Sequence, residues 1–428
     1  MKRANLILMA ALAAAGLTTV TGALLMPATA FAAAEAAAEQ KVSAKLGKPL
    51  RAAQEAIAAK NYPEAFAQLD AAAAMEGKTV YDSFMIDELR WFAQVQTKDY
   101  AGAVDSLTRA VNAGFVPAAD LPRRYKALTQ LNYELKAYPK AIEWGRKALE
   151  LEPGSKEVVL LVAHSLYLQK DFAGARTLID SFVASGTKPD EQLLLIYVRS
   201  SAELNDRAGT MRGLELLVRN YPATKYWEDL LNNQLYETKS DRDLRALYRL
   251  MVDTNTLNKA DEFSEMATTL LSGGFPTEAK GVLEKGIGAN AFSGESLTRA
   301  QADLTRARAG ADADRKDLPG TDQALAAAKT GNEMVATGKL LFNVGQHDKA
   351  ADAFRKGLAK GGVADVDDAN ALLGIALVRG GKGAEAIEAF SRIRDPKLGE
   401  IGRLWKLLVE TNAAPAAAPA PAAAPPAG

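Results

Sequence analysis

The stretch that decides the fold is residues 128–141, which read LTQLNYELKAYPKA. Apolar residues recur in it at helical spacing as far as Leu135, and a second apolar period opens at Tyr138. Two short amphipathic helices separated by so few residues lie antiparallel and bury their apolar faces against each other. The stretch therefore predicts a helical hairpin.

The same pattern returns along the chain at a nearly constant interval, as in KDYAGA at 98–103 and KDFAGA at 170–175. A small residue three positions after the aromatic one, or its nearest equivalent, marks each second helix: Ala65, Ala103, Ala141, Ala175, Thr210, Leu244, Ala279, Ala350 and Ala386. The intervals are 38, 38, 34, 35, 34, 35, 71 and 36 residues, and the double interval predicts one degenerate unit. Such a period predicts stacked units that bury their apolar faces only against their neighbours.

These features resemble the tetratricopeptide repeat (TPR) family, whose units are antiparallel helix pairs with a small residue where the two helices cross. The resemblance covers most of residues 41–410, and Pro153 and Pro222 fall just after second helices, which proline ends. It implies an all-α fold, a right-handed α-solenoid of about nine to ten TPR-like helical hairpins. A C-terminal capping helix over residues 399–409, which contain Trp405, is expected to cover the last unit.

Composition predicts a further division of the chain. We expect an N-terminal TPR solenoid over residues 33–290, and C-terminal TPR repeats with the capping helix over residues 326–410. Residues 291–325 between them are predicted to be a divergent repeat with a loop or hinge, because they are rich in Asp, Gly and Pro where a regular unit should be. Residues 411–428, nearly all Ala and Pro, are expected to be a disordered tail with nothing to bury.

The first residues predict export. Lys2 and Arg3 precede residues 4–34, which carry no charge and include a long apolar centre. We expect a signal peptide over residues 1–32, cleaved near Ala32, and a periplasmic or secreted product without a stable membrane span. An uncleaved inner-membrane anchor is the alternative, since the uncharged stretch is long enough to cross a bilayer of about 30 Å.

Charge and residue usage narrow the function classes. The 428 residues contain 52 Lys and Arg against 52 Asp and Glu, so the basic footprint of a nucleic-acid binder is missing. The chain has no Cys and only two His, which leaves few routes to metal or nucleophile chemistry. The acidic runs at 312–317 and 365–368 lack the glycine and terminal glutamate of a calcium loop. We therefore expect a protein that is not an enzyme, with no catalytic residues, no cofactor, no metal and no nucleic-acid partner.

The resemblance also implies a binding surface, because first helices line the concave face in the family. Carrying that register through the units gives Gln130, His164, Arg199 and Asn233 at one position, Tyr133, Tyr167 and Tyr236 one turn later, and Lys126 and Asp229 one turn earlier. Tyrosine offers a large contact area at low entropic cost, and amide or guanidinium groups bond a peptide backbone. The competing interpretation is that these tyrosines only pack between adjacent first helices.

The function expected from these features is a protein–protein interaction scaffold of the bacterial cell envelope that holds a protein or peptide partner in its groove. Residues 219–226 resemble the Tyr-Pro junctions of envelope-assembly repeat proteins, which favours outer-membrane or surface-polymer assembly. Two alternatives stay open. One is a glycan-binding module whose tyrosines stack on sugar rings, and the other is a peptidoglycan- or polysaccharide-processing enzyme built on a helical solenoid. The sequence does not indicate an oligomeric state.

Overall fold

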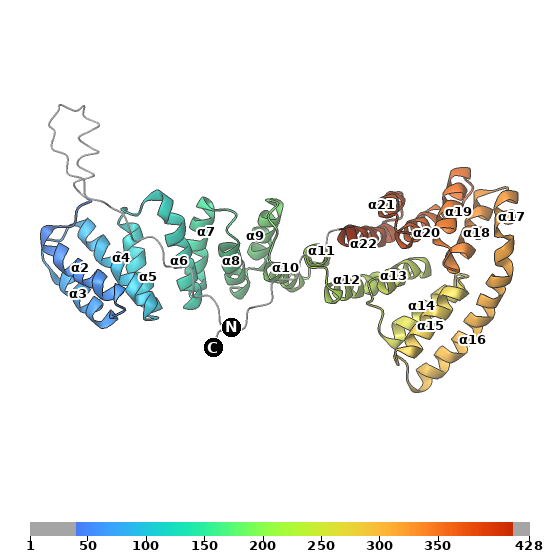
Figure 1. Ribbon diagram of the computed structural model, residues 1–428, viewed down its shortest axis with the longest axis horizontal. Coiled ribbons are helices and arrows are strands. Elements are labelled where there is room, and N and C mark those ends of the chain that lie inside the picture. Colours follow the sequence, from blue (N-terminus) through green and yellow to red (C-terminus); the bar gives the residue numbers. More distant parts are fainter. Residues whose placement is uncertain (1–39, 414–428) are drawn as a thin grey trace, which may run out of the picture. The chain divides into compact units, whose positions relative to one another are not determined.

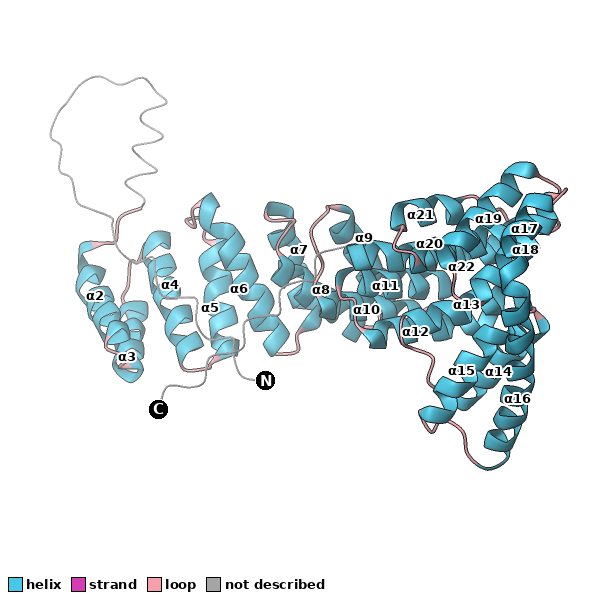
Figure 2. Ribbon diagram, turned by 45° about the vertical axis from the view of Figure 1, so that its right-hand side comes forward, coloured by secondary structure: helices cyan, strands magenta, loops and turns pink. Residues whose placement is uncertain are grey.

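The computed structural model describes residues 40–413. Every regular element among those residues is a helix, and Figure 2 shows these helices joined by short loops. The all-α class and the solenoid of helical hairpins are thus confirmed. The chain divides into two compact units, one ending at Ala137 and the other beginning at Tyr138.

The first unit consists of two helical hairpins, α2–α3 and α4–α5, followed by a short 3₁₀ turn and one further helix (Figure 1). Its elements are α2 (Ala44–Ala58), α3 (Tyr62–Ala74), α4 (Val80–Gln96), α5 (Tyr100–Asn112), η1 (Ala118–Asp120) and α6 (Leu121–Glu134). Each first helix also packs against the second helix of the preceding hairpin, as α4 does on α3. The apolar stripe of α4 is thereby buried on both sides, which is how a repeat array makes one continuous core.

The second unit begins with α7 and continues the alternation of first and second helices (Figure 1). Its helices as far as the long α16 are α7 (Tyr138–Leu151), α8 (Lys156–Leu168), α9 (Phe172–Ala184), α10 (Glu191–Glu203), α11 (Arg207–Asn220), α12 (Thr224–Glu237), α13 (Asp241–Asp253), α14 (Ala260–Ser272), α15 (Pro276–Gly288) and α16 (Gly294–Asp317). The remaining elements are η2 (Leu318–Gly320), α17 (Thr321–Ala327), α18 (Gly331–Asn343), α19 (His347–Lys360), α20 (Val366–Arg379), α21 (Gly383–Ser391) and α22 (Pro396–Ala413).

Most marker residues of the repeat are buried at the same position of each second helix. The seven alanines among them are fully buried: Ala65, Ala103, Ala141, Ala175, Ala279, Ala350 and Ala386. Leu244 is also buried, whereas Thr210 is half-buried and the neighbouring Gly209 is buried beside it. The period deduced from the sequence is therefore the period of the packing, because a side chain no larger than a methyl group lets two helices approach closely.

The turn inside most hairpins has one fixed geometry. In eight repeats, a residue with positive φ stands five positions before the marker residue: Lys60, Lys98, Lys136, Lys170, Asn205, Gly274, Gly345 and Gly381. The next residue donates its N–H to the carbonyl five positions back, as Asp99 does to Gln94 at 2.8 Å. This Schellman-type closure satisfies carbonyls that the end of the first helix leaves open.

The C-terminal helix does more than cap the last repeat. α22 is longer than the expected 399–409, and it packs on α21, α20, α13 and α11. Figure 1 shows α22, drawn in red, beside α13, drawn in green, although residues 254–395 lie between them in the sequence. Trp405 is 1% exposed, stacks on Phe390 with ring centroids 6.0 Å apart, and donates its indole N–H to the Ala246 carbonyl at 3.1 Å.

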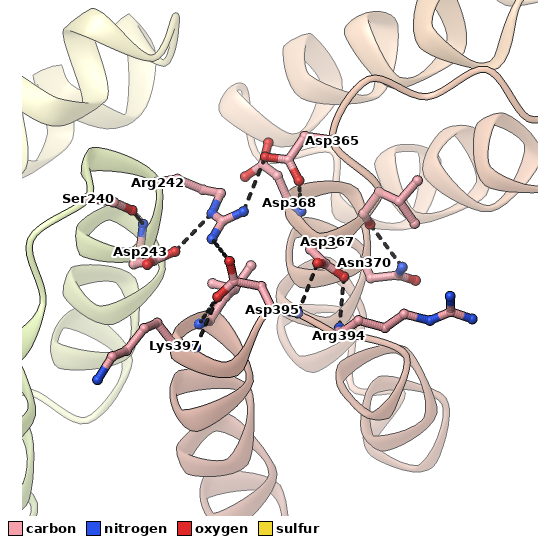
Figure 3. A network of polar contacts seen from close by, with 12 residues as sticks. Ser240, Arg242, Asp243, Asp365, Asp367, Asp368, Asn370, Arg394, Asp395 and Lys397 are labelled. Atoms are coloured by element: carbon pink, nitrogen blue, oxygen red, sulfur yellow. Dashed lines mark hydrogen bonds and ion pairs between the residues drawn. The ribbon is translucent and has the colours of Figure 1, made fainter.

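A polar network joins the N-terminal ends of three helices in this second unit (Figure 3). Arg242 of α13 donates to Asp243 at 2.8 Å, to Asp365 before α20 at 3.4 Å, and to Asp395 before α22 at 2.9 Å. Asp367 accepts the backbone N–H groups of Arg394 and Asp395 at 2.9 and 3.0 Å. The acidic run at 365–368 is thus used to fasten α20 and α22 to α13.

Two arginines share one buried carboxylate inside the second unit. Arg249 of α13 is 2% exposed and grips Glu278 of α15, with its Nη2 2.7 Å from Glu278 Oε2. Arg379 of α20 reaches Glu278 at 3.3 Å and Asp253 at 3.1 Å. Burial alone would raise the pKa of Glu278, but the two guanidinium groups hold it below its ordinary value. This ion cluster links α13, α15 and α20 through residues far apart in sequence.

The region expected to contain a loop or hinge is helical instead. α16 runs unbroken through most of residues 291–325, and its buried residues, Ala300, Leu304, Ala307 and Ala311, form one narrow stripe at i, i+4, i+7 and i+11 against its neighbours. The Asp and Gly residues that suggested a loop do not interrupt this helix. Asp312 is exposed and pairs with Arg315 one turn along the helix, whereas Gly310 lies against Pro276 and Asp314 accepts a hydrogen bond from the Thr277 hydroxyl at 2.8 Å. The expected disordered tail lies outside the described residues, except for its first three.

Trp405→Ala should destabilise the second unit strongly. The change removes the stacked ring and the indole hydrogen bond from a fully buried position, so the free energy of unfolding should fall by about 3–5 kcal/mol. Urea unfolding followed by far-ultraviolet circular dichroism measures it. The control Leu151→Ala truncates a side chain that is 50% exposed and should change the free energy by less than about 0.5 kcal/mol. A similar small loss for both variants would show that α22 does not hold the unit together.

Lys98→Gly should stabilise the first unit. Lys98 has φ of 64°, a region that costs a residue with a Cβ roughly 1 kcal/mol, and glycine relieves that cost at the price of greater unfolded-state entropy. We expect a net gain of about 0.5 kcal/mol in the free energy of unfolding. Lys147→Gly in the middle of α7 is the matched control, and it should lose about 1 kcal/mol. A loss at position 98 would contradict the left-handed turn.

Candidate functional site

All nine sequence-predicted binding residues lie on first helices, as the register requires. Lys126, Gln130 and Tyr133 are half-buried on α6 of the first unit. The other six belong to the second unit: His164 and Tyr167 on α8, Arg199 on α10, and Asp229, Asn233 and Tyr236 on α12. The exposure of their side chains, which decides whether they could touch a ligand, differs from helix to helix.

His164 and Arg199, equivalent positions of two successive units, lie close together. Helices α8 and α10 pack against each other, and the positive charge of Arg199 acts on the His164 ring. Burial first, and then Arg199, lower the pKa of His164 below its usual value. His164 is half-buried and Arg199 is exposed, so the imidazole is neutral at pH 7 and the guanidinium is the group that meets solvent.

Tyr167 supports the competing interpretation of the tyrosine row. Its ring lies 5.3 Å from that of Phe172, the first residue of the second helix in the same hairpin. The side chain is half-buried, as is that of Tyr133 on α6. Packing within the hairpin accounts for the aromatic residue at position 167, so Tyr167 is a weaker binding candidate than its position in the row implies.

Tyr236 is different, because 77% of it is exposed. Its ring lies at an open depression of about 420 Å³ on the second unit, lined also by Arg207, Asn232, Asn233 and Glu237. The Arg207 guanidinium donates to the Asn233 carbonyl at 3.0 Å, which holds the start of α11 against α12. An exposed aromatic ring among amide and guanidinium groups can stack on a ligand and hydrogen-bond it at the same time. This α12 site, defined as these five residues, is the strongest candidate.

Sequence reasoning placed Asn233 and Tyr236 in this site but missed Arg207, Asn232 and Glu237. Arg207 and Glu237 stand at the ends of α11 and α12 rather than on the outward face of a first helix. Their side chains pair across the site, with Arg207 Nε 3.9 Å from Glu237 Oε1. The 30-residue separation of that pair, close to one repeat, is the only sequence signal that points to it.

A second depression, in the first unit, was also not predicted. It has a volume of about 490 Å³ and lies between α3 and α5 over α4. Its charged groups are already engaged: Arg109 Nη2 lies 2.7 Å from Asp87 Oδ1, and Arg90 Nη1 lies 2.7 Å from Asp70 Oδ1. Its lining also includes no aromatic side chain, so the depression offers a ligand less stacking surface than the α12 site does.

The buried Glu278 carboxylate is bonded to two arginine side chains. Among residues 40–413 no group of three His, Asp or Glu side chains is arranged to hold a metal ion. Glu278 bonds the guanidinium groups of Arg249 and Arg379 through both of its oxygens, so neither oxygen is left to exchange a proton with a substrate. This cluster is suited to holding helices together.

No protein-family model and no curated protein matches the chain. Among solved structures, a chain of the Naa15/Naa10 complex bound to HypK-THB is 13% identical with a TM-score of 0.38; the match covers 83% of this chain and 64% of that one, so this chain spans less than two thirds of its length. A tetratricopeptide repeat protein from Parabacteroides merdae is 14% identical with a TM-score of 0.32, covering 78% of this chain and 100% of its own. Pseudomonas aeruginosa pilF is 18% identical with a TM-score of 0.26; the match covers 43% of this chain and 95% of pilF. At these scores the comparisons assign neither activity nor partner.

Arg199→Gln should raise the pKa of His164 toward 6.5, because it removes a neighbouring positive charge while the burial stays. NMR titration of the imidazole protons measures it, and the second histidine, His347, serves as an internal reference. An unchanged His164 pKa would contradict the approach of α8 and α10 at these positions.

Protonation of His164 also makes the free energy of unfolding depend on pH. Since the folded-state pKa of His164 is lowered, the unfolded chain takes up a proton first as the pH falls below about 6.5, and stability present above that pH is lost. His164→Gln removes this group, so between pH 7 and pH 5 the free energy of unfolding of the variant should fall less than that of the wild type.

Proposed function

We propose that this protein is a non-catalytic scaffold that binds a segment of a protein partner, and that the α12 site is its principal contact. The exposed ring of Tyr236 is the observation that carries the proposal. A tyrosine that is 77% exposed contributes little to folding, yet its ring can bury a large apolar area against a ligand. Around it, Asn232 and Arg207 supply donors that fix the direction of a peptide backbone, while the Asn233 amide bonds the Asp229 carbonyl at 2.8 Å.

The rigidity of the surrounding helices supports binding without a large ordering cost. Behind Tyr236, the neighbouring α12 residues Trp227, Leu230 and Leu231 are buried in the core of the second unit. The Arg207 bond to the Asn233 carbonyl ties α11 to α12 at the site itself. Because the site is already held in place, ordering its own side chains on binding costs little free energy. His164 and Arg199 on α8 and α10 are the next contacts that such a segment could use.

The setting we propose is the bacterial cell envelope, with outer-membrane or surface-polymer assembly as the process served. Support comes from the sequence of residues 1–34, where a basic start precedes a long uncharged apolar stretch typical of export signals. That prediction lies outside the described residues. Within residues 40–413 no helix combines the length and the apolar character that crossing a bilayer requires.

A glycan-binding role is the second candidate, and the composition of the α12 site favours it over the enzymatic alternative. One exposed aromatic ring with amide, guanidinium and carboxylate neighbours can stack on a sugar and bond its hydroxyls. Purified cell-wall polysaccharide should then shift the NMR signals of the Asn232 and Asn233 side chains. No shift at saturating polysaccharide leaves the protein partner as the ligand.

Tyr236→Ala should abolish retention of the partner. Immobilised protein with a photo-crosslinking residue at Glu237 should capture the same envelope protein repeatedly, and we expect at least a tenfold loss on removing the Tyr236 ring. Such a loss is typical of an aromatic contact at the centre of an interface. Mass spectrometry of the crosslinked product measures it.

Leu151→Ala is the matched control, because it also truncates an exposed apolar side chain of the second unit, away from α12. It should retain the partner fully. Equal retention by wild type and both variants would move the binding surface away from the α12 site.

A further inference from the structure

The chain contains its own candidate ligand for the α12 site. Residues 414–428 consist of Ala, one final Gly and five prolines, at positions 415, 419, 421, 425 and 426. We propose that the α12 site binds extended proline-containing segments and that residues 414–428 of the same chain occupy it when no partner is bound. This proposal rests on the proposed function, since it names the chemistry of the ligand that the same site accepts.

The chemistry of the site matches that of the segment. Proline has no N–H, so residues 414–428 offer fifteen carbonyl acceptors against ten N–H donors, together with five apolar proline rings. The α12 site offers donors beside an exposed ring: the Tyr236 hydroxyl, the Asn232 amide, and the Arg207 N–H groups that its contacts with the Asn233 carbonyl and Glu237 leave. The Asn233 amide already donates to the Asp229 carbonyl at 2.8 Å. Asn232 accepts from Lys259 through its Oδ1 at 3.5 Å, which leaves its amide N–H groups to donate. Aromatic rings beside hydrogen-bond donors are how extended proline-rich segments are recognised in general.

The charge of the site also suits this occupant. Arg207 and Glu237 pair across the site, and the Lys239 ammonium lies 5.3 Å from the Tyr236 ring centroid while donating to the Tyr236 carbonyl at 2.7 Å. These contacts keep the charged groups at the edge of the site occupied. A segment of fifteen uncharged residues can therefore lie there without leaving a charge unpaired.

The segment begins close enough to reach the site. Near the end of α22, Glu410 pairs with Arg219 of α11 at 2.7 Å, which fixes where the chain leaves the second unit. Arg207 lies twelve residues earlier on the same helix, or about 18 Å along its axis. Fifteen residues in an extended proline-type conformation span about 46 Å, which leaves length for a path around α11 or α12.

Because residues 414–428 belong to the same chain as the α12 site, even a weak affinity between them gives substantial occupancy. A segment linked so closely to its site has an effective concentration of the order of millimolar. A dissociation constant of about 1 mM for the free segment would then leave the site about half occupied, and a partner with micromolar affinity would displace it readily. One exposed tyrosine with a few donors is adequate for an affinity that low, and the site would be kept covered until a tighter ligand arrives.

Disulfide trapping in the full chain tests the proposal, because the natural sequence has no cysteine. Glu237→Cys at the site is combined with Ala420→Cys in the segment, and the rate of intramolecular disulfide formation is followed under oxidised glutathione. Glu284→Cys on α15, combined with the same Ala420→Cys, gives the rate of random encounter. We expect the first pair to form its disulfide at least fivefold faster than the second.

Tyr236→Ala in the background of the first pair separates binding from proximity. It removes only an exposed ring, so the helices should be unchanged by circular dichroism, and the trapping rate should fall to that of the Glu284 pair. Trapping that is unaffected by Tyr236→Ala, or no faster than in the Glu284 pair, would overturn the proposal.

Deletion of residues 414–428 distinguishes this proposal from the proposed function. If the segment covers the site, the deletion should raise retention of the envelope partner by two- to threefold, as expected for a site that was half occupied. If neither the full chain nor the shortened chain retains a partner while trapping still depends on Tyr236, the partner proposal fails and the intramolecular contact stands. If retention occurs at the Tyr236 site but trapping does not depend on Tyr236, the reverse holds.

Discussion

A small side chain buried at the same position of most second helices is the constraint on which the rest of the structure depends. Ala103 and its alanine equivalents are fully buried, and a residue with positive φ stands five positions before each of them, where the chain turns back into the second helix. Once that geometry is fixed, every first helix presents the same face, which is why residues in different hairpins, such as His164 and Arg199, come together. The α12 site is one outcome of this regularity, and its exposure comes from the absence of a large neighbour over Tyr236 within the described unit.

The second unit adds long-range contacts that a simple array of repeats does not need. A linear array is held by nearest neighbours alone, but here α22 packs on α13 and α11, and Trp405 bonds the backbone of α13. The Arg249–Glu278–Arg379 cluster places a carboxylate between two cations in the interior, where removing Glu278 would leave the buried Arg249 guanidinium without its carboxylate partner. These contacts join residues that are 29 to 159 positions apart in sequence. This part of the chain should therefore unfold as one cooperative body.

Sequence reasoning worked where the relevant contacts are local. The period of the markers, the two-helix unit and the helix ends near Pro153 and Pro222 all follow from residues within about 35 positions of one another, and the structure confirms them. It was less successful at 291–325, where Asp, Gly and Pro residues suggested a loop. There the stripe that holds α16 is made of small alanines, which carry a weaker apolar signal than leucine, so the helical period was hard to see. Domain boundaries, export and the Ala- and Pro-rich segment stay predictions.

For the binding surface, the sequence by itself determined the helical hairpin and its period, because helical geometry depends on neighbouring positions only. Which first-helix side chains meet a ligand stays a prediction. The tertiary structure decided which of those side chains are accessible: Tyr167 packs on Phe172, whereas Tyr236 is exposed and acquires Arg207 and Glu237 as neighbours. It also decided that α22 returns to α13. The exposure of a side chain and its long-range contacts depend on which distant segments pack against it. The local sequence of a repeat does not specify those segments.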